Sequence, residues 1–185
     1  MGGEGGGRYA GYVLTGGASS RMGRDKAALP YRGGTLAEAV ARAVAEAAGS
    51  AILVGNPERN PGAIPDLYPG EGPLGGILTA LHHTRAEWNL VVACDMPEID
   101  GRMLRALLER AEQERADALL PAGPSGLPEP LCAVYRLRVL EALEEAFARG
   151  VRKITAALGD RMRTAPVHWE FHNVNTPEDW ARYAE

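Results

Sequence analysis

A glycine-rich stretch with two basic side chains follows the first apolar segment of the chain. It reads YVLTGGASSRMGRDKAAL over residues 12–29 and contains the pair Gly16-Gly17, followed by Arg21 and Lys26. Glycines let a backbone approach a ligand closely, and the exposed N–H groups of such a loop can surround phosphate oxygens. The two cations add charge of the opposite sign. The pattern predicts a loop that binds a phosphate-bearing ligand rather than a solvated turn.

The spacing of this loop excludes the two commonest phosphate-binding loops. A Walker loop has four residues between its glycines, followed at once by Lys and Ser or Thr. Here five residues separate Gly17 from Gly23, and Lys26 comes three residues later. A Rossmann loop opens directly into a helix, whereas ALPYRGGT lies between this loop and the next predicted helix.

A second candidate for chemistry is Asp95, which directly follows an almost continuously apolar segment, WNLVVAC (88–94). Such a segment is typical of a central parallel strand that is buried on both faces. Ligands of parallel sheets bind outside the carboxyl ends of the strands, where Asp95 would lie. Mg²⁺ prefers oxygen ligands and often uses one or two carboxylates plus substrate phosphates. Asp95 is therefore the candidate magnesium ligand, and a turn or helix-capping role before Pro97 is the alternative.

The elements that must position these residues alternate between strands and helices. Residues 56–72 and 123–129 are rich in Pro and Gly and predict loops, the first with a short extended piece at residues 63–64. The alternation predicts a three-layer α/β domain with a mostly parallel sheet, in which the glycine-rich loop and Asp95 share one edge. Strands are expected at 9–15, 50–55, 88–95, 116–122, 130–136 and 164–169, and helices at 35–49, 73–84, 100–115, 137–150, 153–158 and 176–185.

Composition narrows the class of protein. The chain has 185 residues, which suits one domain, here 9–185 after a flexible tail at 1–8. A net charge of −4 argues against a broad nucleic-acid surface, which is usually basic. Cys94 and Cys132 predict reduced core thiols of a cytoplasmic protein. No apolar stretch approaches the ~20 residues that span a bilayer, and the start of the sequence lacks signal-peptide features. None of the four histidines forms a pair with metal-ligand spacing and a third ligand.

The glycine-rich loop matches a third pattern, L-x-G-G-x-S-x-R-M-G-x-D-K, without a gap. This pattern resembles the signature of the molybdenum cofactor guanylyltransferases, which are nucleotidyltransferases with a Rossmann-like, glycosyltransferase-A-like α/β fold. Three further stretches resemble motifs of that family in the same order: GPLGGI (72–77), ACDMP (93–97) and NVNTPED (173–179). Together the four motifs extend over residues 12–179, nearly the whole chain.

The resemblance implies positions for the groups of a bound GTP. Backbone N–H groups from Gly17 to Arg21 would meet the phosphates, and Lys26 would neutralise charge on the α-phosphate and the departing pyrophosphate. Arg21 would touch the triphosphate or the product, and a surface ion pair is its alternative. Three residues would contact the guanine and ribose: Leu14, Thr15 and Gly16.

The resemblance also implies contacts from the Pro-rich segment. Asp66 would lie near the guanine or ribose, and Asn56 would contact the base; a plain turn residue is the alternative for both. Gly72, Leu74 and Gly75 would close the nucleotide pocket, or only permit tight packing between helix and sheet.

The acceptor side is implied by the C-terminal motif. Asn173 and Asn175 would lie near molybdopterin and the metal, and fixing a turn before a helix cap is their alternative role. Arg152 and Lys153 are candidates for docking an anionic acceptor phosphate, although basic side chains are usually solvated.

The implied reaction transfers GMP from GTP to the molybdenum cofactor, giving its guanine dinucleotide form and pyrophosphate with Mg²⁺ as cofactor. GTP, molybdopterin, other cofactor-biosynthesis proteins and molybdoenzyme chaperones are the expected partners, without nucleic acid or membrane. Cytidylyl transfer is the nearest alternative, although those relatives usually have Ala-Gly in place of Gly16-Gly17. A nucleotidyltransferase for a sugar or alcohol phosphate fits NVNTPED less well. A non-catalytic nucleotide-binding adaptor would not need Lys26 and Asp95.

Overall fold

A seven-stranded sheet organises the protein in a computed structural model that describes residues 7–16 and 25–183. Its order is β5-β4-β1-β6-β8-β7-β9, and adjacent strands are parallel except where β8 pairs with β6 and β7. β8 is antiparallel because the loop that joins it to β7 is too short for the crossover that parallel strands need. The strands are β1 (Tyr9–Leu14), β4 (Ile52–Gly55), β5 (Ile64–Pro65), β6 (Trp88–Ala93), β7 (Ala118–Ala122), β8 (Cys132–Arg136) and β9 (Met162–Pro166).

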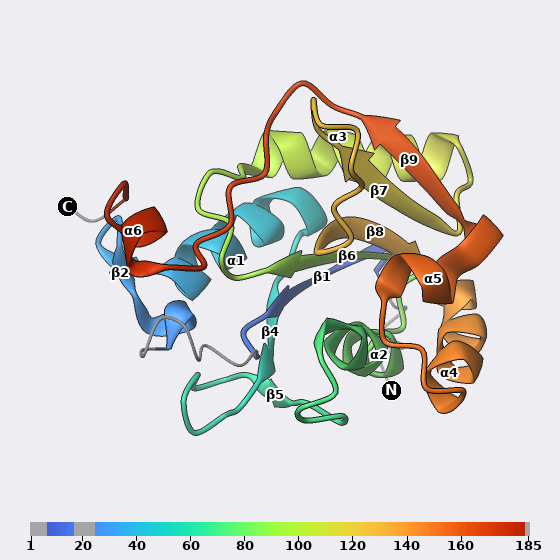
Figure 1. The fold of residues 1–185 in the computed structure, drawn as a ribbon, viewed down its shortest axis with the longest axis horizontal. Coiled ribbons are helices and arrows are strands. Elements are labelled where there is room, and N and C mark those ends of the chain that lie inside the picture. Colours follow the sequence, from blue (N-terminus) through green and yellow to red (C-terminus); the bar gives the residue numbers. More distant parts are fainter. Residues whose placement is uncertain (1–6, 17–24, 184–185) are drawn as a thin grey trace, which may run out of the picture.

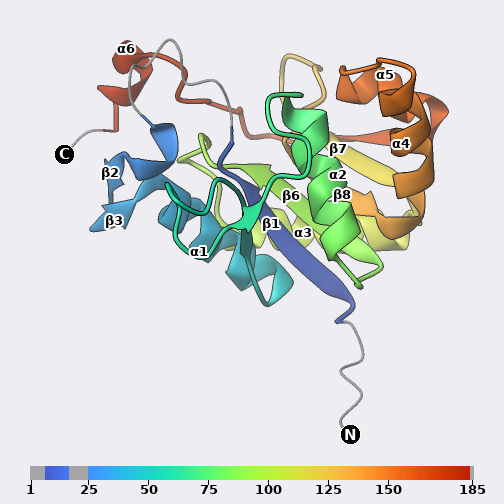
Figure 2. The same cartoon turned by 90° about the horizontal axis from the view of Figure 1, so that it is seen from below.

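Helices cover both faces of the sheet, so the predicted three-layer α/β fold is confirmed (Figure 1). One layer holds α1 (Leu36–Ala48) and α3 (Gly101–Gln113), and the other holds α2 (Pro73–His83), α4 (Leu140–Ala148) and α5 (Ile154–Leu158). Figure 2 shows α2 beside β1, with α4 and α5 farther along the same layer. Among the described residues, no helix combines the length and apolarity needed to cross a bilayer.

The caps and burial patterns that the sequence predicted for these helices and strands are present in the structure. α1 begins with a capping box, in which Thr35 accepts from the Glu38 N–H and Glu38 accepts from the Thr35 N–H, and Gly49 ends it in the left-handed region at φ 87°. Every residue of β6 is buried, as expected for a strand covered on both faces. Cys94 and Cys132 are buried free thiols, as predicted.

Some boundaries differ from the prediction. β9 covers Met162–Pro166 rather than 164–169, since its pairing with β7 begins at Met162 and ends at Pro166. The terminal helix α6 is only Pro177–Trp180. A short hairpin of β2 (Pro30–Tyr31) and β3 (Gly34–Thr35) was not predicted; Arg32 and Gly33 turn it with positive φ angles of 48° and 74°. A pair of two-residue strands carries too little periodicity to stand out in the sequence.

Gly11 lets α1 approach β1 closely. A Cβ at this buried position would lie 2.4 Å from both the Ser50 carbonyl oxygen and Val44 Cγ1. We expect Gly11→Ala to lower the free energy of unfolding by about 1–3 kcal/mol, the usual cost of overpacking, as measured by urea denaturation. Gly7→Ala is the control, because its nearest neighbour would be 3.4 Å from the new Cβ. Equal stability of the two variants would contradict the close packing of α1 on β1.

Candidate active site

The carboxyl ends of three parallel strands meet at one edge of the sheet. Leu14 of β1 lies in register with Val54 of β4 on one side and Ala93 of β6 on the other. Thr15 continues from β1 and binds β4: its N–H and its hydroxyl donate to the Val54 carbonyl at 2.9 and 3.0 Å. Asp95 follows β6 by two residues. The prediction that Asp95 and the start of the glycine-rich loop share an edge is confirmed.

A cleft with a volume of about 780 Å³ opens at this edge, within the usual size of a small-molecule site. The ends of β1, β4 and β6, the loop after β5 and the start of α2 all contribute residues to its lining. Its lining includes these predicted site residues: Leu14, Thr15, Gly16, Lys26, Asn56, Asp66, Gly72 and Asp95.

At one end of the cleft, the lining residues Lys26 and Asp95 form a cluster of three polar side chains with Asn175, which does not itself line the cleft. Lys26 Nζ lies 3.3 Å from Asp95 Oδ2 and donates to Asn175 Oδ1 at 2.7 Å. The Lys26 and Asp95 side chains are only 16% and 18% exposed. The C-terminal segment reaches the cluster because the Val174 N–H donates to the Asp95 carbonyl at 2.8 Å. The fold thus joins three motifs that are far apart in the sequence.

Two features of this cluster suit an ion and a phosphate. Asp95 Oδ1 is buried and has no hydrogen-bond partner among the described residues, which is rare for a buried carboxylate oxygen and leaves it free for a hard cation. Lys26 begins the 3-10 helix η1 (Lys26–Ala28), whose first turn is fixed by Asp25 Oδ1 accepting from the Ala27 N–H at 3.0 Å. The ammonium group is therefore held on an ordered turn.

The other end of the cleft contains Asn56 and Asp66, and both also stabilise turns. Asn56 Oδ1 accepts from the Glu58 N–H at 2.8 Å. Asp66 Oδ1 accepts from the Tyr68 N–H and from the Thr79 hydroxyl, each at 2.9 Å. Each residue thus combines the turn role and the cleft-lining position that the sequence left as alternatives.

The glycine-rich start of α2 serves packing as well as the cleft. Gly72 caps α2 at φ 80°, and a Cβ at Gly75 would lie 2.9 Å from Tyr68 Cβ. The Leu74 side chain is fully buried in the core under α2 and is not among the lining side chains. For Leu74 and Gly75 the structure shows the packing role.

Four further predicted residues either do not line the cleft or fall outside the described residues. Gly17 and Arg21 fall within residues 17–24, which the structure does not describe. Arg152 forms an ion pair with Glu71 instead of projecting as a free cation, and Lys153 precedes α5. Neither Arg152 nor Lys153 lines the cleft.

The comparisons with known proteins agree with this geometry. The family model described as a MobA-like NTP transferase domain matches residues 11–162. The chain belongs to the MobA-like NTP transferase family. Within that family, a probable molybdenum cofactor guanylyltransferase of Nostoc sp. is 35% identical over 91% of this chain and 87% of its own length. A relative of the same name from Bacillus cereus is 29% identical over 95% of each chain.

Solved structures support the same assignment. The molybdopterin-guanine dinucleotide biosynthesis protein A of Archaeoglobus fulgidus has a TM-score of 0.77 and 30% identity, and covers 94% of this chain and 96% of its own. A 2-C-methyl-D-erythritol 4-phosphate cytidylyltransferase of Thermus thermophilus, at 18% identity and TM-score 0.68 over 93% and 95% of the two chains, shows the shared fold. This MobA-like protein is therefore an enzyme of the nucleotidyltransferase class, as predicted.

A carboxylate that the sequence analysis did not select is bonded to the lining of the MobA-like site, although it does not itself line the cleft. Glu129 Oε1 accepts from the N–H of Leu131, which lines the cleft. Burial raises the pKa of Glu129, the Leu131 N–H opposes this, and the negative charge of Asp95 raises it further. No motif marked this residue, because its proximity to Asp95 arises from the pairing of β8 with β6.

We call residues 167–183, which follow β9 and carry Asn175, the C-terminal arm. An ionic contact holds this arm. His172 Nδ1 lies 2.8 Å from Glu98 Oε2, and the Tyr183 hydroxyl donates to Glu98 Oε1 at 2.6 Å. The hydrogen bond with Glu98 raises the pKa of His172 above 6.5, and the hydrogen bonds from His172 and Tyr183 lower the pKa of Glu98 below 4.5. The contact thus favours the protonated form of His172 and the ionised form of Glu98.

The contact should stabilise the protein most in mildly acidic solution. Because the pKa of His172 is raised in the folded protein, His172 stabilises the fold fully at pH values below its ordinary pKa, and this stabilisation is lost as the pH rises through the folded pKa. Because the pKa of Glu98 is lowered, Glu98 stabilises the fold fully at pH values above its ordinary pKa, and this stabilisation is lost as the pH falls through the folded pKa. Both contributions are therefore complete between about pH 4.5 and 6.5. We expect His172→Gln to lower Tm more at about pH 5.5 than at pH 8.5, with His168→Gln as the control. Equal losses of Tm at both pH values would contradict it.

Proposed function

We propose that this protein transfers GMP from GTP to the molybdenum cofactor and releases pyrophosphate. The observation that carries the proposal is the cluster of Lys26, Asp95 and Asn175 at the head of the cleft, in a chain whose relatives bear the name of that activity. Phosphoryl transfer depends mainly on positioning and charge stabilisation, and this cluster supplies a cation and a carboxylate within one short distance.

The cleft suits a nucleoside triphosphate lying from one end to the other. In this orientation the phosphates lie at Gly16 and Lys26, and the base and ribose lie toward Asn56 and Asp66. Arg21 and Gly17 would extend the phosphate contacts through the segment that precedes Lys26 in the sequence. The C-terminal arm, with Asn173 and Asn175, borders the side from which the acceptor reaches the α-phosphate.

The proposed step is a direct displacement without a covalent enzyme intermediate. An oxygen of the acceptor's terminal phosphate forms a bond to the α-phosphorus of GTP, and the bond from that phosphorus to the bridging oxygen of pyrophosphate breaks. Pyrophosphate leaves with the electron pair, and Lys26 Nζ stabilises the charge that develops on these oxygens.

Mg²⁺ is the cofactor that the residues fit best. Asp95 would hold it through the buried, unpartnered Oδ1, and the bound ion supplies Lewis-acid charge on phosphate oxygens. Within the described residues, no group of three or more His, Cys, Asp or Glu side chains forms a metal site by itself. Substrate phosphates and water would complete the coordination, as is common for Mg²⁺.

The test is turnover with purified molybdenum cofactor, Mg²⁺ and either GTP or CTP, followed by pyrophosphate release and by identification of the dinucleotide product. The proposal expects product with GTP and far less with CTP. Turnover of CTP but not GTP would assign the protein to cytidylyl transfer instead. Nucleotide binding without turnover of either would favour a non-catalytic adaptor.

A further inference from the structure

The loop that follows β5 lines the end of the cleft that contains Asn56 and Asp66. Phe147 of α4 and Arg152, which follows α4, contact this loop. We name the residues from Asp66 to Gly72 the base loop; Asp66, Pro69, Gly70 and Gly72 line the cleft. The base loop contains no helix or strand, so its position depends on what it contacts. Two contacts join it to the α4 side, one aromatic and one ionic.

The aromatic contact joins Tyr68 to Phe147 of α4. Their ring centroids lie 4.9 Å apart at an interplanar angle of 61°, an edge-to-face arrangement that is attractive beyond its buried area. On its other side Tyr68 packs against α2 at Gly75, where a Cβ would come within 2.9 Å of Tyr68 Cβ. Tyr68 is therefore held between α2 and α4, two residues from Asp66.

The ionic contact joins Glu71 to Arg152. Arg152 Nε lies 2.7 Å from Glu71 Oε2, and Arg152 Nη1 donates to the Phe147 carbonyl at 2.8 Å. The guanidinium carbon also lies 3.9 Å from the centre of the Phe147 ring. Arg152 is thus oriented by three independent contacts and spans from the end of α4 to the base loop.

We propose that Arg152 is a positioning residue for nucleotide recognition, which holds the base loop at the distance from Asn56 that the nucleobase requires. The inference rests on the proposed function, and it adds a specificity-determining residue to it. Arg152 acts through Glu71 and Phe147 and contacts no substrate. The pair is half exposed, so its effect should be moderate and graded rather than a loss of folding.

Binding of two probes separates this role from a general structural one. GTP occupies both ends of the cleft, whereas pyrophosphate with Mg²⁺ requires only the phosphate end. We expect Arg152→Ala to weaken GTP binding about three- to tenfold, which is the combined scale of an exposed ion pair and a cation–π contact, and to leave pyrophosphate binding unchanged. The ratio of the GTP and CTP affinities should also move toward one, and calorimetry measures all three constants.

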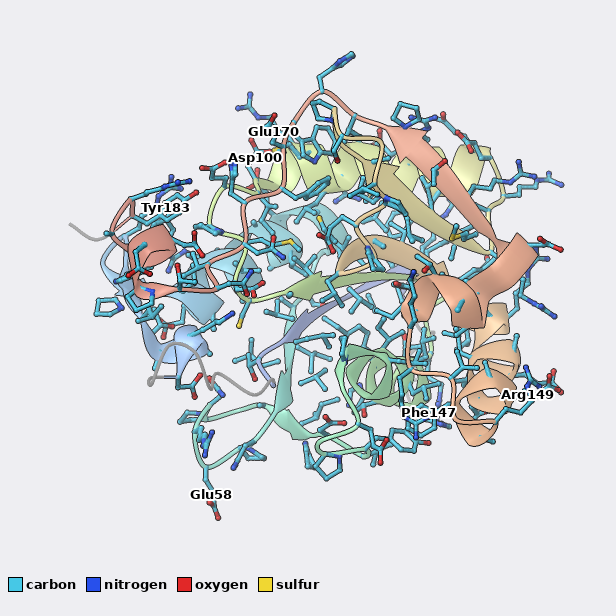
Figure 3. The ribbon with its side chains drawn as sticks, viewed as in Figure 1. Glu58, Asp100, Phe147, Arg149, Glu170 and Tyr183 are labelled. Carbon is cyan, nitrogen blue, oxygen red and sulfur yellow. The ribbon has the colours of Figure 1, made fainter. Side chains whose placement is uncertain are left out.

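Matched variants complete the experiment. Glu71→Ala should give a smaller GTP-specific loss, because it removes the ion pair but leaves Arg152 on the Phe147 ring. The double variant should lose no more than Arg152→Ala alone, because the ion pair can be lost only once. The exchanged pair, Glu71→Arg with Arg152→Glu, should recover part of the loss. Arg149→Ala is the control: Arg149 follows the last residue of α4, forms an ion pair with Glu145 at 3.9 Å and projects away from the base loop (Figure 3).

Two results would overturn the inference. One is GTP binding by Arg152→Ala that equals that of the parent protein, and the other is an equal weakening of GTP and pyrophosphate, which indicates a general structural effect. Failure of the proposed function looks different, because the parent protein itself would then bind GTP no better than pyrophosphate or would give no product with it.

Discussion

Replacing Lys26 by methionine should lower kcat about 100- to 1,000-fold, the scale on which a single charge-stabilising donor contributes to a transition state. Methionine keeps most of the aliphatic stem but removes the ammonium group that lies 3.3 Å from Asp95 and 2.7 Å from Asn175. No other described cation lines the cleft, so the described residues offer no substitute for the lost charge. Single-turnover pyrophosphate release measures the effect on the chemical step.

Controls distinguish lost chemistry from lost structure. Lys26→Met leaves Asp95 Oδ2 without its partner in a mostly buried position, so Tm must be measured for each variant. Lys26→Arg keeps the charge but replaces a compact ammonium with a planar fork, and should retain part of the activity. Arg102→Ala, an exposed change on α3, should retain all of it. A Lys26→Met protein with parental kcat would remove Lys26 from the mechanism.

Much of the site could be predicted because its residues are marked by local signals. Thr15 and Asp95 each follow a short apolar strand, and parallel strands put their carboxyl ends at one edge whatever their order in the sheet. Local signals also predicted α1, because its capping box and its terminal glycine can be recognised in the sequence alone. The contact between Lys26 and Asn175 did not follow from spacing, but both residues belonged to motifs that the resemblance placed at one site.

The residues that were missed or misplaced depend on contacts between distant segments. Arg152 looked like a free cation for a phosphate, because the sequence could not show that Glu71 lies 2.7 Å away. Leu74 was expected at the pocket because it belongs to the GPLGGI motif of the resemblance, yet helical geometry turns its side chain into the core. Glu129 was overlooked because only the antiparallel return of β8 beside β6 brings it near Asp95.

Replacing Asp95 by asparagine should abolish Mg²⁺-dependent turnover, with a fall in kcat of about 1,000-fold or more, because metal-ion charge stabilisation contributes several kcal/mol. Asparagine preserves the shape of the side chain and can still accept from Lys26, so the fold should survive. It removes the negative charge, and its neutral amide is a weaker ligand for a hard cation than the buried carboxylate oxygen of the parent protein. Turnover measured over a range of Mg²⁺ concentrations should show a higher half-saturating concentration as well as a lower maximum.

The chain offers a close control for this substitution five residues downstream. Asp100 is an exposed carboxylate that caps α3 by accepting from the Met103 N–H at 2.8 Å, and Figure 3 shows it near that helix. Asparagine caps helices as well as aspartate does, so Asp100→Asn should keep parental turnover and parental Mg²⁺ dependence. If Asp95→Asn also kept both, Asp95 would not be the metal ligand; if the two variants lost activity equally, the loss would reflect charge near α3 rather than coordination at the cleft. Only a selective loss in Asp95→Asn, with Tm unchanged, agrees with a metal held by the carboxylate that follows β6.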